Sequence, residues 1–163
     1  MDPFSLRIGI GHDTHRLQPG GPLRIGGVDI PFEYELVGHS DADVLLHAIT
    51  DAILGAAALG DIGELFPNTD EENHNRDSLE MLSLAANKVA SEGFELINLD
   101  CIIHAQKPKM LGFRDRIRSV ISQSLGLDLS RISLKAKTGE NVGPVGEGQS
   151  IEAQCIALIY KPS

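Results

Sequence analysis

The chain has 163 residues, of which 42% are hydrophobic and 23% are charged, a composition typical of a folded globular domain. Its 14 Lys and Arg residues are outnumbered by 23 Asp and Glu residues, which gives a formal net charge of −9 at pH 7. Because nucleic acids and anionic membranes bind positive surfaces, this charge argues against both as general partners. Neither a run of the roughly 20 apolar residues that span a bilayer nor a signal or transit pattern is found, so we expect a cytoplasmic protein.

We expect residues 1–163 to form a single domain, because no repeat, low-complexity tract or linker interrupts them. We expect residues 1–6 to be either disordered or an addition to the native protein. Cys101 and Cys155 lie in apolar runs without CxxC spacing. We therefore expect two buried, free thiols in a reducing cytosol.

The first elements are two strands, RIGIG at 7–11 and LRIGGVDI at 23–30, around a loop rich in Pro and Gly. The segment GHDTH follows the first strand and spaces Asp13 and His15 two positions apart. In an extended chain both side chains then point to the same side. The sequence therefore predicts a carboxylate and an imidazole directed together from the end of a strand.

The strongest helix signal covers residues 39–60, where apolar side chains recur at helical spacing. Ser40 is the expected N-cap, with Asp43 three residues later, and Gly60 is the expected end.

The remaining elements follow in chain order: a loop at 61–76, a helix at 77–93, a strand at 94–105, a helix at 112–125 and strands at 131–138 and 150–160. Asp77 or Ser78 opens the second helix and Gly93 closes it, and Gly126 stops the third. This order predicts an α/β (α+β) domain with a mixed sheet and helices packed on one face.

His47 lies in the first predicted helix, with Asp43 and Asp51 one turn away on either side. Taken alone, it is most simply a half-buried, hydrogen-bonded histidine. Together with Asp13 and His15 it gives a set of two histidines and one carboxylate. Zinc bound by three protein ligands keeps a fourth position open, as in a catalytic site. Asp43 or Asp51 is then a candidate acceptor for an imidazole N–H.

His39 and Ser40 stand at the start of the same predicted helix. The free N–H groups and the positive dipole end of a helix N-terminus favour an anion. Simple capping by Ser40 is the alternative, and both can hold, since one capping contact leaves other N–H groups free.

Four of the 14 cations lie close to predicted strand ends: Lys107, Lys109, Lys135 and Lys137. Ligand sites of α/β proteins often form at such ends, although each segment could also be a solvated turn. Glu140 follows the second pair and offers an oxygen ligand suited to magnesium or manganese beside substrate phosphates.

The chain closely resembles the 2-C-methyl-D-erythritol 2,4-cyclodiphosphate synthases of the non-mevalonate isoprenoid pathway. Four segments carry the resemblance: GHDTH at 11–15, HSDADVLLHAITDAILGAAALGDIGELFPNTD at 39–70, AQKPKML at 105–111 and KAKTGE at 135–140. The resemblance runs from about Arg7 to Tyr160 and implies a homotrimer of α/β subunits with active sites between neighbours. It also implies the reaction: the 2-phosphate of 4-diphosphocytidyl-2-C-methyl-D-erythritol 2-phosphate attacks the β-phosphorus, expels CMP and closes a cyclic diphosphate.

The resemblance assigns roles to individual residues. It implies that Asp13, His15 and His47 bind zinc and that Glu140 contacts a magnesium or manganese ion. His39 and Ser40 would hold the terminal phosphate, and His39 and Thr138 would stabilise the transition state. The implied substrate contacts are Asp13, His15, His39 and Ser40; Asp61, Ile62, Gly63, Phe66, Pro67, Asn68, Thr69 and Asp70 at the methylerythritol phosphate; Ala105, Gln106, Lys107, Pro108, Lys109, Met110 and Leu111 at cytidine; and Lys137, Thr138, Gly139 and Glu140 at the phosphates.

The chemistry of the residues fits this reaction. Two anionic phosphates must approach each other, so the protein should supply charge neutralisation and geometry and needs no nucleophile of its own. Zinc acting as a Lewis acid on the β-phosphate, a second metal between the α- and β-phosphates, and nearby lysines would do this. They would also reconcile an acidic protein with a polyanionic substrate.

The chain departs from the family pattern in three places. Many bacterial members read TTTE where this chain has KTGE at 137–140, so we expect altered affinity and retained activity. Many members also carry an aromatic residue and an arginine where this chain has Pro144 and Glu147. Those residues are tied to an isoprenoid-diphosphate cavity on the trimer axis, so the binding of such a ligand is in question. Asn68 stands where Asp is usual.

Two other functions remain as alternatives. A zinc-dependent phosphohydrolase would use the same open site to activate water, with Asp43, Asp51 or Asp61 as the base. A non-enzymatic trimeric metal-binding or ligand-binding module would need a closed zinc shell, and no fourth protein ligand such as a well-placed cysteine appears. The synthase is the preferred prediction.

Overall fold

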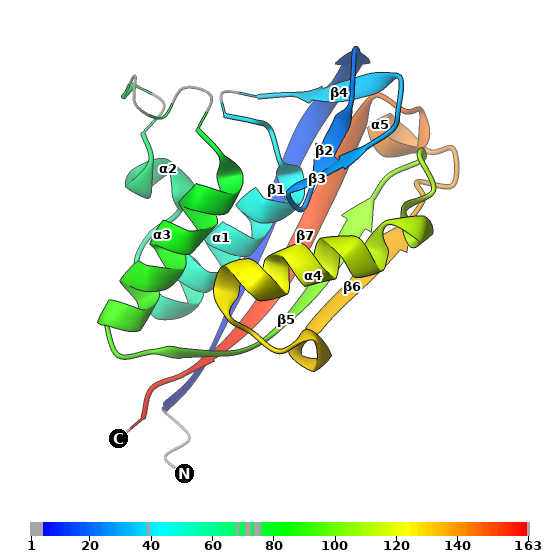
Figure 1. Cartoon of the computed structure of the whole chain (residues 1–163). Helices are drawn as coiled ribbons and strands as arrows, with labels where there is room; N and C mark the ends of the chain where they lie inside the picture. The colour runs from blue at the N-terminus through cyan, green and yellow to red at the C-terminus, as the bar shows by residue number, and fades with distance from the viewer. Residues whose placement is uncertain (1–4, 39, 68, 71–72, 74–75, 163) are drawn as a thin grey trace.

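The computed structural model describes residues 5–38, 40–67, 69–70, 73 and 76–162. Its main sheet has five strands in the order β4-β1-β7-β5-β6 (Figure 1). The strands are β1 (Leu6–Pro19), β4 (Tyr34–Val37), β5 (Glu95–His104), β6 (Ile132–Lys137) and β7 (Ser150–Tyr160). Neighbouring strands are antiparallel except for β5 and β6, which are parallel. The predicted mixed sheet is therefore confirmed.

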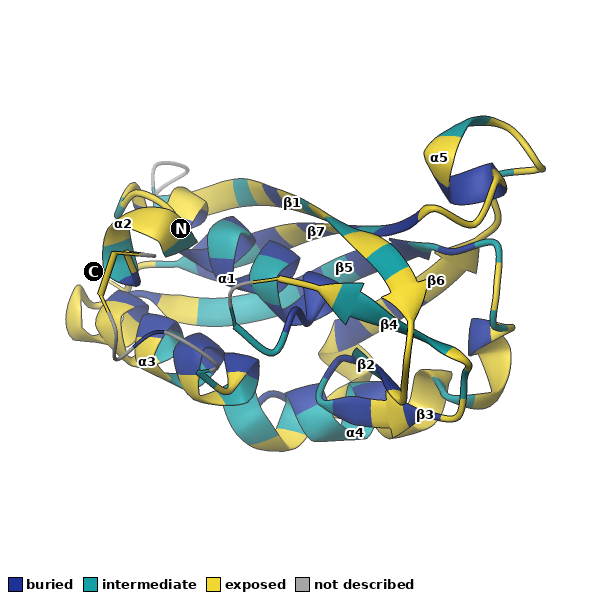
Figure 2. Ribbon diagram, turned by 90° about the horizontal axis from the view of Figure 1, so that it is seen from above, coloured by how far each residue is buried: buried dark blue, intermediate teal, exposed yellow. Residues whose placement is uncertain are grey.

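Helices cover one face of this sheet (Figure 1). The long ones are α1 (Val44–Ala57), α3 (Ser78–Ser91) and α4 (Arg114–Leu125), and the short ones are α2 (Ile62–Leu65), α5 (Gly143–Gly146) and the 3₁₀ turns Met110–Gly112 and Leu129–Arg131. Helix α1 packs on β1 and β7, and α3 packs on α1. Most side chains of α1 are buried, as expected for a helix enclosed between a sheet and other helices. Figure 2 shows the buried residues gathered in this middle layer.

Strand β1 is much longer than the predicted strand at 7–11. It runs through the whole GHDTH segment, so that segment lies inside a strand and not at its end. The extension comes from pairing with β7, which holds β1 from Leu6, opposite Tyr160, to Arg16, opposite Ser150. Leu6 is therefore ordered, so the expected disorder does not include it, and residues 1–4 lie outside the described residues.

The predicted strand at 23–30 is two strands, β2 (Leu23–Ile25) and β3 (Val28–Ile30), which form a separate two-stranded sheet. Gly26 and Gly27 make the turn between them, with φ of +61° and +72°. Such a two-residue turn needs positive φ at both positions, which glycine adopts without strain. Strand β4, and helix α2 inside the predicted loop at 61–76, were not expected.

Helix α1 begins at Val44 and ends at Ala57, inside the predicted range of 39–60. Its N-cap is Asp43 and not Ser40: the Asp43 carboxylate accepts the N–H of Leu46 at 3.1 Å. The helix ends because Ala58 takes a left-handed conformation, two residues before Gly60.

The later elements match the sequence within two residues at each end. Asp77 caps α3 and Gly126 ends α4, as predicted. Cys101 and Cys155 are buried and free, also as predicted. Within the described residues, none of the helices combines the length and the apolar character needed to cross a membrane.

The second face of the main sheet carries exposed apolar side chains. Ile8, Ile10 and Ile156 are 74%, 70% and 50% exposed. Side chains alternate along a strand, and Gly9 and Gly11 of β1 lie against α1, so Ile8 and Ile10 point away from the helices.

Candidate functional site

Three side chains that could hold a metal ion converge where β1 passes under α1. Asp13 and His15 come from β1, and His47 comes from the first half of α1. Asp13 Oδ2 lies 2.8 Å from His15 Nε2 and 3.0 Å from His47 Nδ1, and the two imidazole nitrogens are 3.2 Å apart. The structure thus brings together the set of two histidines and one carboxylate that the sequence suggested.

The hydrogen bond of His15 directs a lone pair into this cluster. His15 Nδ1 lies 2.9 Å from the carbonyl oxygen of Val37, and a carbonyl only accepts. Nδ1 therefore carries the proton in the neutral ring, and Nε2 offers its lone pair to the cluster. All three ligand atoms lie within 4.8 Å of one another, and their types suit a divalent metal ion.

When no metal ion is bound, the Asp13 carboxylate favours the protonated form of His15. The pKa of the Asp13 carboxyl lies far below its ordinary value: burial alone raises it, but hydrogen bonds with His15 and His47 lower it by more. Burial lowers the pKa of His15, but the hydrogen bond and charge of Asp13 raise it above its ordinary value of 6.5. A bound divalent cation would replace this proton as the positive charge among the three ligands.

The expected carboxylate partners of His47 are not its partners. Asp43 caps α1 and also accepts the N–H groups of Gly26 and Gly27, and Asp51 accepts the N–H of Ile62 at 2.8 Å. His47 Nε2 instead lies 2.9 Å from Ser78 Oγ and 3.0 Å from Ser40 Oγ.

A cavity of about 180 Å³ opens beside the three ligands. It is lined by Asp13, His15, Ser40, His47, Ile62, Gly63, Phe66, Asn73 and Met81. Seven of these are predicted site residues, and Asp51 contributes indirectly because it fixes the start of the short helix α2. Asn73 and Met81 were not predicted, and no local pattern distinguishes them from other loop and helix residues.

The other residues of the predicted methylerythritol-phosphate group lie next to this cavity in the chain. Asp61 caps α2 by accepting the N–H of Glu64 at 2.9 Å. The carbonyl oxygen of Pro67 accepts the N–H of Asp70 and the side-chain amide of Asn73, both at 3.0 Å. Thr69 is exposed. His39 and Asn68 lie outside the described residues.

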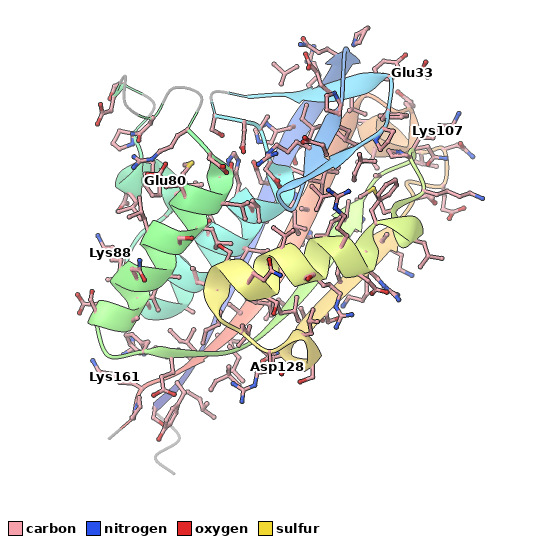
Figure 3. All side chains as sticks on the ribbon, in the orientation of Figure 1. Glu33, Glu80, Lys88, Lys107, Asp128 and Lys161 are labelled. Atoms are coloured by element: carbon pink, nitrogen blue, oxygen red, sulfur yellow. The ribbon has the colours of Figure 1, made fainter. Side chains whose placement is uncertain are left out.

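The predicted cytidine group lies elsewhere on the same chain. Met110, Leu111 and Lys137 line a cavity of about 410 Å³, together with Arg114, which was not predicted. Gln106 and Lys107 line a neighbouring cavity of about 360 Å³ with Glu33 and Glu147 among others. Figure 3 labels Glu33 and Lys107 at the same edge of the molecule. Of the remaining predicted residues, Ala105 is buried, and Pro108 and Lys109 continue the loop to the Met110 turn.

The predicted phosphate loop is ordered by its own hydrogen bonds. Gln106 joins it to the cytidine group, since its side chain accepts the N–H of Gly139 at 3.2 Å and donates to Asn141 at 3.0 Å. Thr138 Oγ1 donates to Glu140 Oε1 at 2.8 Å, and Glu140 is exposed. Among the described residues, none of this loop lines the cavity of Asp13, His15 and His47. The predicted site residues therefore form two groups within one chain.

Comparison with known proteins agrees with both the fold and the cluster. Residues 6–160 match the YgbB family. The 2-C-methyl-D-erythritol 2,4-cyclodiphosphate synthase of Burkholderia thailandensis is 54% identical over 97% of this chain and 98% of its own length. The synthase of the same name from Rhodopirellula baltica is 47% identical over 98% and 96%. The solved IspF–CDP complex of Plasmodium falciparum is 34% identical, with a TM-score of 0.86 over 98% of both chains. On this match over nearly its whole length, the chain belongs to the YgbB family.

Proposed function

We propose that the chain converts 4-diphosphocytidyl-2-C-methyl-D-erythritol 2-phosphate to 2-C-methyl-D-erythritol 2,4-cyclodiphosphate and CMP, as a cytoplasmic enzyme of the non-mevalonate pathway. The observation that carries this proposal is the convergence of Asp13, His15 and His47 on one small cavity. Close relatives that cover the same length bear the synthase name. The negative charge of the chain favours a small-molecule substrate over nucleic acid or a membrane.

In this proposal Asp13, His15 and His47 hold zinc. When bound, zinc would polarise a phosphate oxygen and neutralise part of its charge. The open side of the three ligands faces the cavity that Ser40, Ile62 and Gly63 also line. The Ser40 hydroxyl, together with His39, would hold the terminal phosphate and so set the approach of the two phosphates.

The second group of residues would bind the cytidine diphosphate. The cavity beside Met110 and Leu111 has the size of a ligand pocket and carries Arg114 and Lys137 as cations. Thr138 and Glu140 would act at the phosphates, with magnesium or manganese at the exposed Glu140 carboxylate. A bound CDP in the Plasmodium falciparum relative supports a nucleotide ligand for this fold.

We propose that a homotrimer joins the two groups at each interface between neighbours. The metal-ligand cavity and the cytidine cavity share no lining residue. The resemblance implies active sites between neighbours, so one substrate would fill the first cavity of one copy and the second cavity of another. The exposed isoleucines on the uncovered sheet face support an apolar contact with a second copy. Each active site would then need residues from two subunits.

The test is ³¹P NMR of the purified protein with the cytidyl substrate, zinc and magnesium, in ¹⁸O-labelled water. We expect CMP and an unlabelled cyclic diphosphate to appear together. His47→Ala should make neither, and the matched control Lys88→Ala, on the outer side of α3 (Figure 3), should behave as the parent. Linear phosphates carrying ¹⁸O would replace the synthase with a zinc-dependent phosphohydrolase, and binding without any product would leave a binding module.

A further inference from the structure

We propose that Asp41, acting through Ser78, is a positioning residue for the metal ligand His47. The inference rests on the proposed function, since it gives these residues a purpose only if His47 binds a metal ion. It concerns the outer side of the His47 ring, which the sequence assigned to Asp43 or Asp51.

Ser78 connects the His47 ring to a carboxylate. It is the first residue of α3, it is fully buried, and its hydroxyl lies 2.9 Å from His47 Nε2. The same hydroxyl makes a short hydrogen bond to Asp41 Oδ1. Asp41 also accepts the backbone N–H of Ser78 at 3.1 Å, so two bonds fix Ser78 to this carboxylate.

Arg24 holds the Asp41 carboxylate from the side opposite Ser78. Its Nε donates to Asp41 Oδ2 at 3.2 Å, and its other nitrogens lie 3.2 Å from Asp29 and 3.7 Å from Asp77. The guanidinium is therefore held between three carboxylates and keeps Asp41 turned toward Ser78. A continuous series of contacts runs from Arg24 through Asp41 and Ser78 to His47.

The direction of each hydrogen bond follows from the groups present. An ionised carboxylate only accepts, so Ser78 must donate its hydroxyl hydrogen to Asp41. The Ser78 oxygen then offers only lone pairs to His47, and Nε2 must be the nitrogen that carries the hydrogen. A hydrogen on Nδ1 can go only to the ionised Asp13 carboxylate, and when a metal ion displaces that hydrogen the Nδ1 lone pair faces the cluster. The series thus selects the tautomer of His47 that can bind a metal ion through Nδ1.

The contacts from Arg24 to His47 leave the hydroxyl of Ser40, which also lies beside the His47 ring, available to bind a ligand. Ser40 Oγ lies 3.0 Å from His47 Nε2, but a single N–H is satisfied by Ser78. Ser40 lines the cavity, and Ser78 does not. With Ser78 as the acceptor of the His47 N–H, the Ser40 hydroxyl can donate to a phosphate in the cavity.

The experiment measures zinc affinity and the His47 tautomer in the full-length protein. Ser78→Ala and Asp41→Asn should each weaken zinc binding about 10-fold to 100-fold, as measured by competition with a chromophoric chelator. In the metal-free protein, ¹⁵N NMR of the His47 ring should find Nε2 carrying a hydrogen in the parent, and in Ser78→Ala a larger share of rings whose only hydrogen is on Nδ1. Ser78→Thr, which keeps the hydroxyl, should retain most of the affinity.

Two controls separate positioning from packing. Ser83→Ala removes a hydroxyl from the same helix that donates to the Leu79 carbonyl, and it should leave zinc affinity and tautomer unchanged. Thr50→Val removes a buried hydroxyl of α1 that donates to the Leu46 carbonyl, so it should lower stability more than zinc affinity. If Ser78→Ala does not fold, Asp41→Asn carries the test.

The outcomes are distinct. Parental zinc affinity and parental occupancy of hydrogen on Nε2 in both Ser78→Ala and Asp41→Asn would overturn the positioning role while leaving the metal site intact. A parent protein that binds no zinc would overturn the metal site itself, and the positioning role with it. Loss of affinity in the two variants but not in Ser83→Ala is the expected result.

Discussion

Gly11 of β1 lies directly against Ala48 of α1. A Cβ on Gly11 would lie 1.9 Å from the Ala48 carbonyl oxygen and 2.7 Å from the Ala52 nitrogen, so only a glycine allows this approach. Ala48 follows His47, and Gly11 precedes Asp13 by two residues on the same side of β1. The contact between backbone and backbone therefore sets how far His47 stands from the two ligands on the strand.

Gly11→Ala should push α1 away from β1. We expect a loss of at least about 2 kcal/mol in the free energy of unfolding, because backbone atoms on both sides leave the methyl group no space. Zinc affinity should fall as well, since His47 moves with the helix. Urea unfolding and zinc titration measure the two effects.

The matched control is Gly55→Ala in the same helix. Its Cβ would meet only the Ile10 carbonyl oxygen, at 4.0 Å. Alanine is the better helix former, so this variant should gain about 0.5–1 kcal/mol. Equal stability of the two variants would contradict a contact limited by the glycine at position 11.

Zinc binding should strengthen as the pH rises. The pKa of His15 is raised in the metal-free protein, so its proton competes with zinc until the pH exceeds that pKa. The stability that this proton gives the metal-free protein is present below pH 6.5 and is lost as the pH rises through the raised value. The gain in melting temperature on adding zinc should therefore grow over this range.

Calorimetric titration in buffers of different ionisation enthalpy would count the proton released. Asp13→Asn is the informative variant, because it removes the carboxylate that raises the pKa of His15. It should bind zinc more weakly and release less of a proton near neutral pH. An affinity that stays constant from about pH 6 to 9 would show that His15 is not a ligand.

The parts of the fold that could be predicted are those set by local signals. Helix α3 begins after Asp77, and α4 stops at Gly126, because a capping carboxylate and a left-handed glycine act within one turn. Strand β1 could not be bounded in this way. Its second half is GHDTHRLQP, which has little β-propensity, and its partner β7 lies more than 130 residues away.

The candidate site also combines parts that local signals predict with parts that depend on contacts between distant residues. The spacing of Asp13 and His15 on one strand is local, and it was visible in the sequence. Residue types alone made His47 a candidate third ligand and the resemblance strengthened it, but its distance from β1 could not be predicted because that distance depends on Gly11. Ser78 is 31 residues from His47 and was seen only as a helix start. Its capping position gave no indication that its side chain faces an imidazole.

Asp43→Ala should be among the most destabilising substitutions in α1. The Asp43 carboxylate is fully buried and accepts the N–H groups of Leu46, Gly26 and Gly27 at 3.1, 2.8 and 2.7 Å. Alanine removes a cap and leaves buried donors without an acceptor, so we expect a loss of about 3 kcal/mol or more. Chemical unfolding measures it.

Asp128→Ala is the control for this prediction. Asp128 also accepts a backbone N–H, from Ser130 at 2.8 Å, but it lies on the surface near the end of α4 (Figure 3). Water can replace its hydrogen bonds, so its loss should be much smaller. A similar effect of the two substitutions would mean that Asp43 acts only as an ordinary helix cap.

Ile10→Asp should break the proposed trimer without unfolding the subunit. Ile10 is 70% exposed on the sheet face that the helices leave uncovered, with Ile8 and Ile156 also exposed on that face. In a single subunit an aspartate there would meet water, whereas at an apolar interface it would be buried without a partner, at a cost of several kcal/mol. We therefore expect a folded monomer by sedimentation analysis, with the synthase activity lost. Zinc affinity should be kept, since Asp13, His15 and His47 all come from one chain.

Leu84→Asp is the matched control: Leu84 is 40% exposed on α3, on the opposite side of the molecule, and its substitution should leave the assembly unchanged. A parent protein that sediments as a monomer and is active would instead place both groups of site residues at work within one subunit.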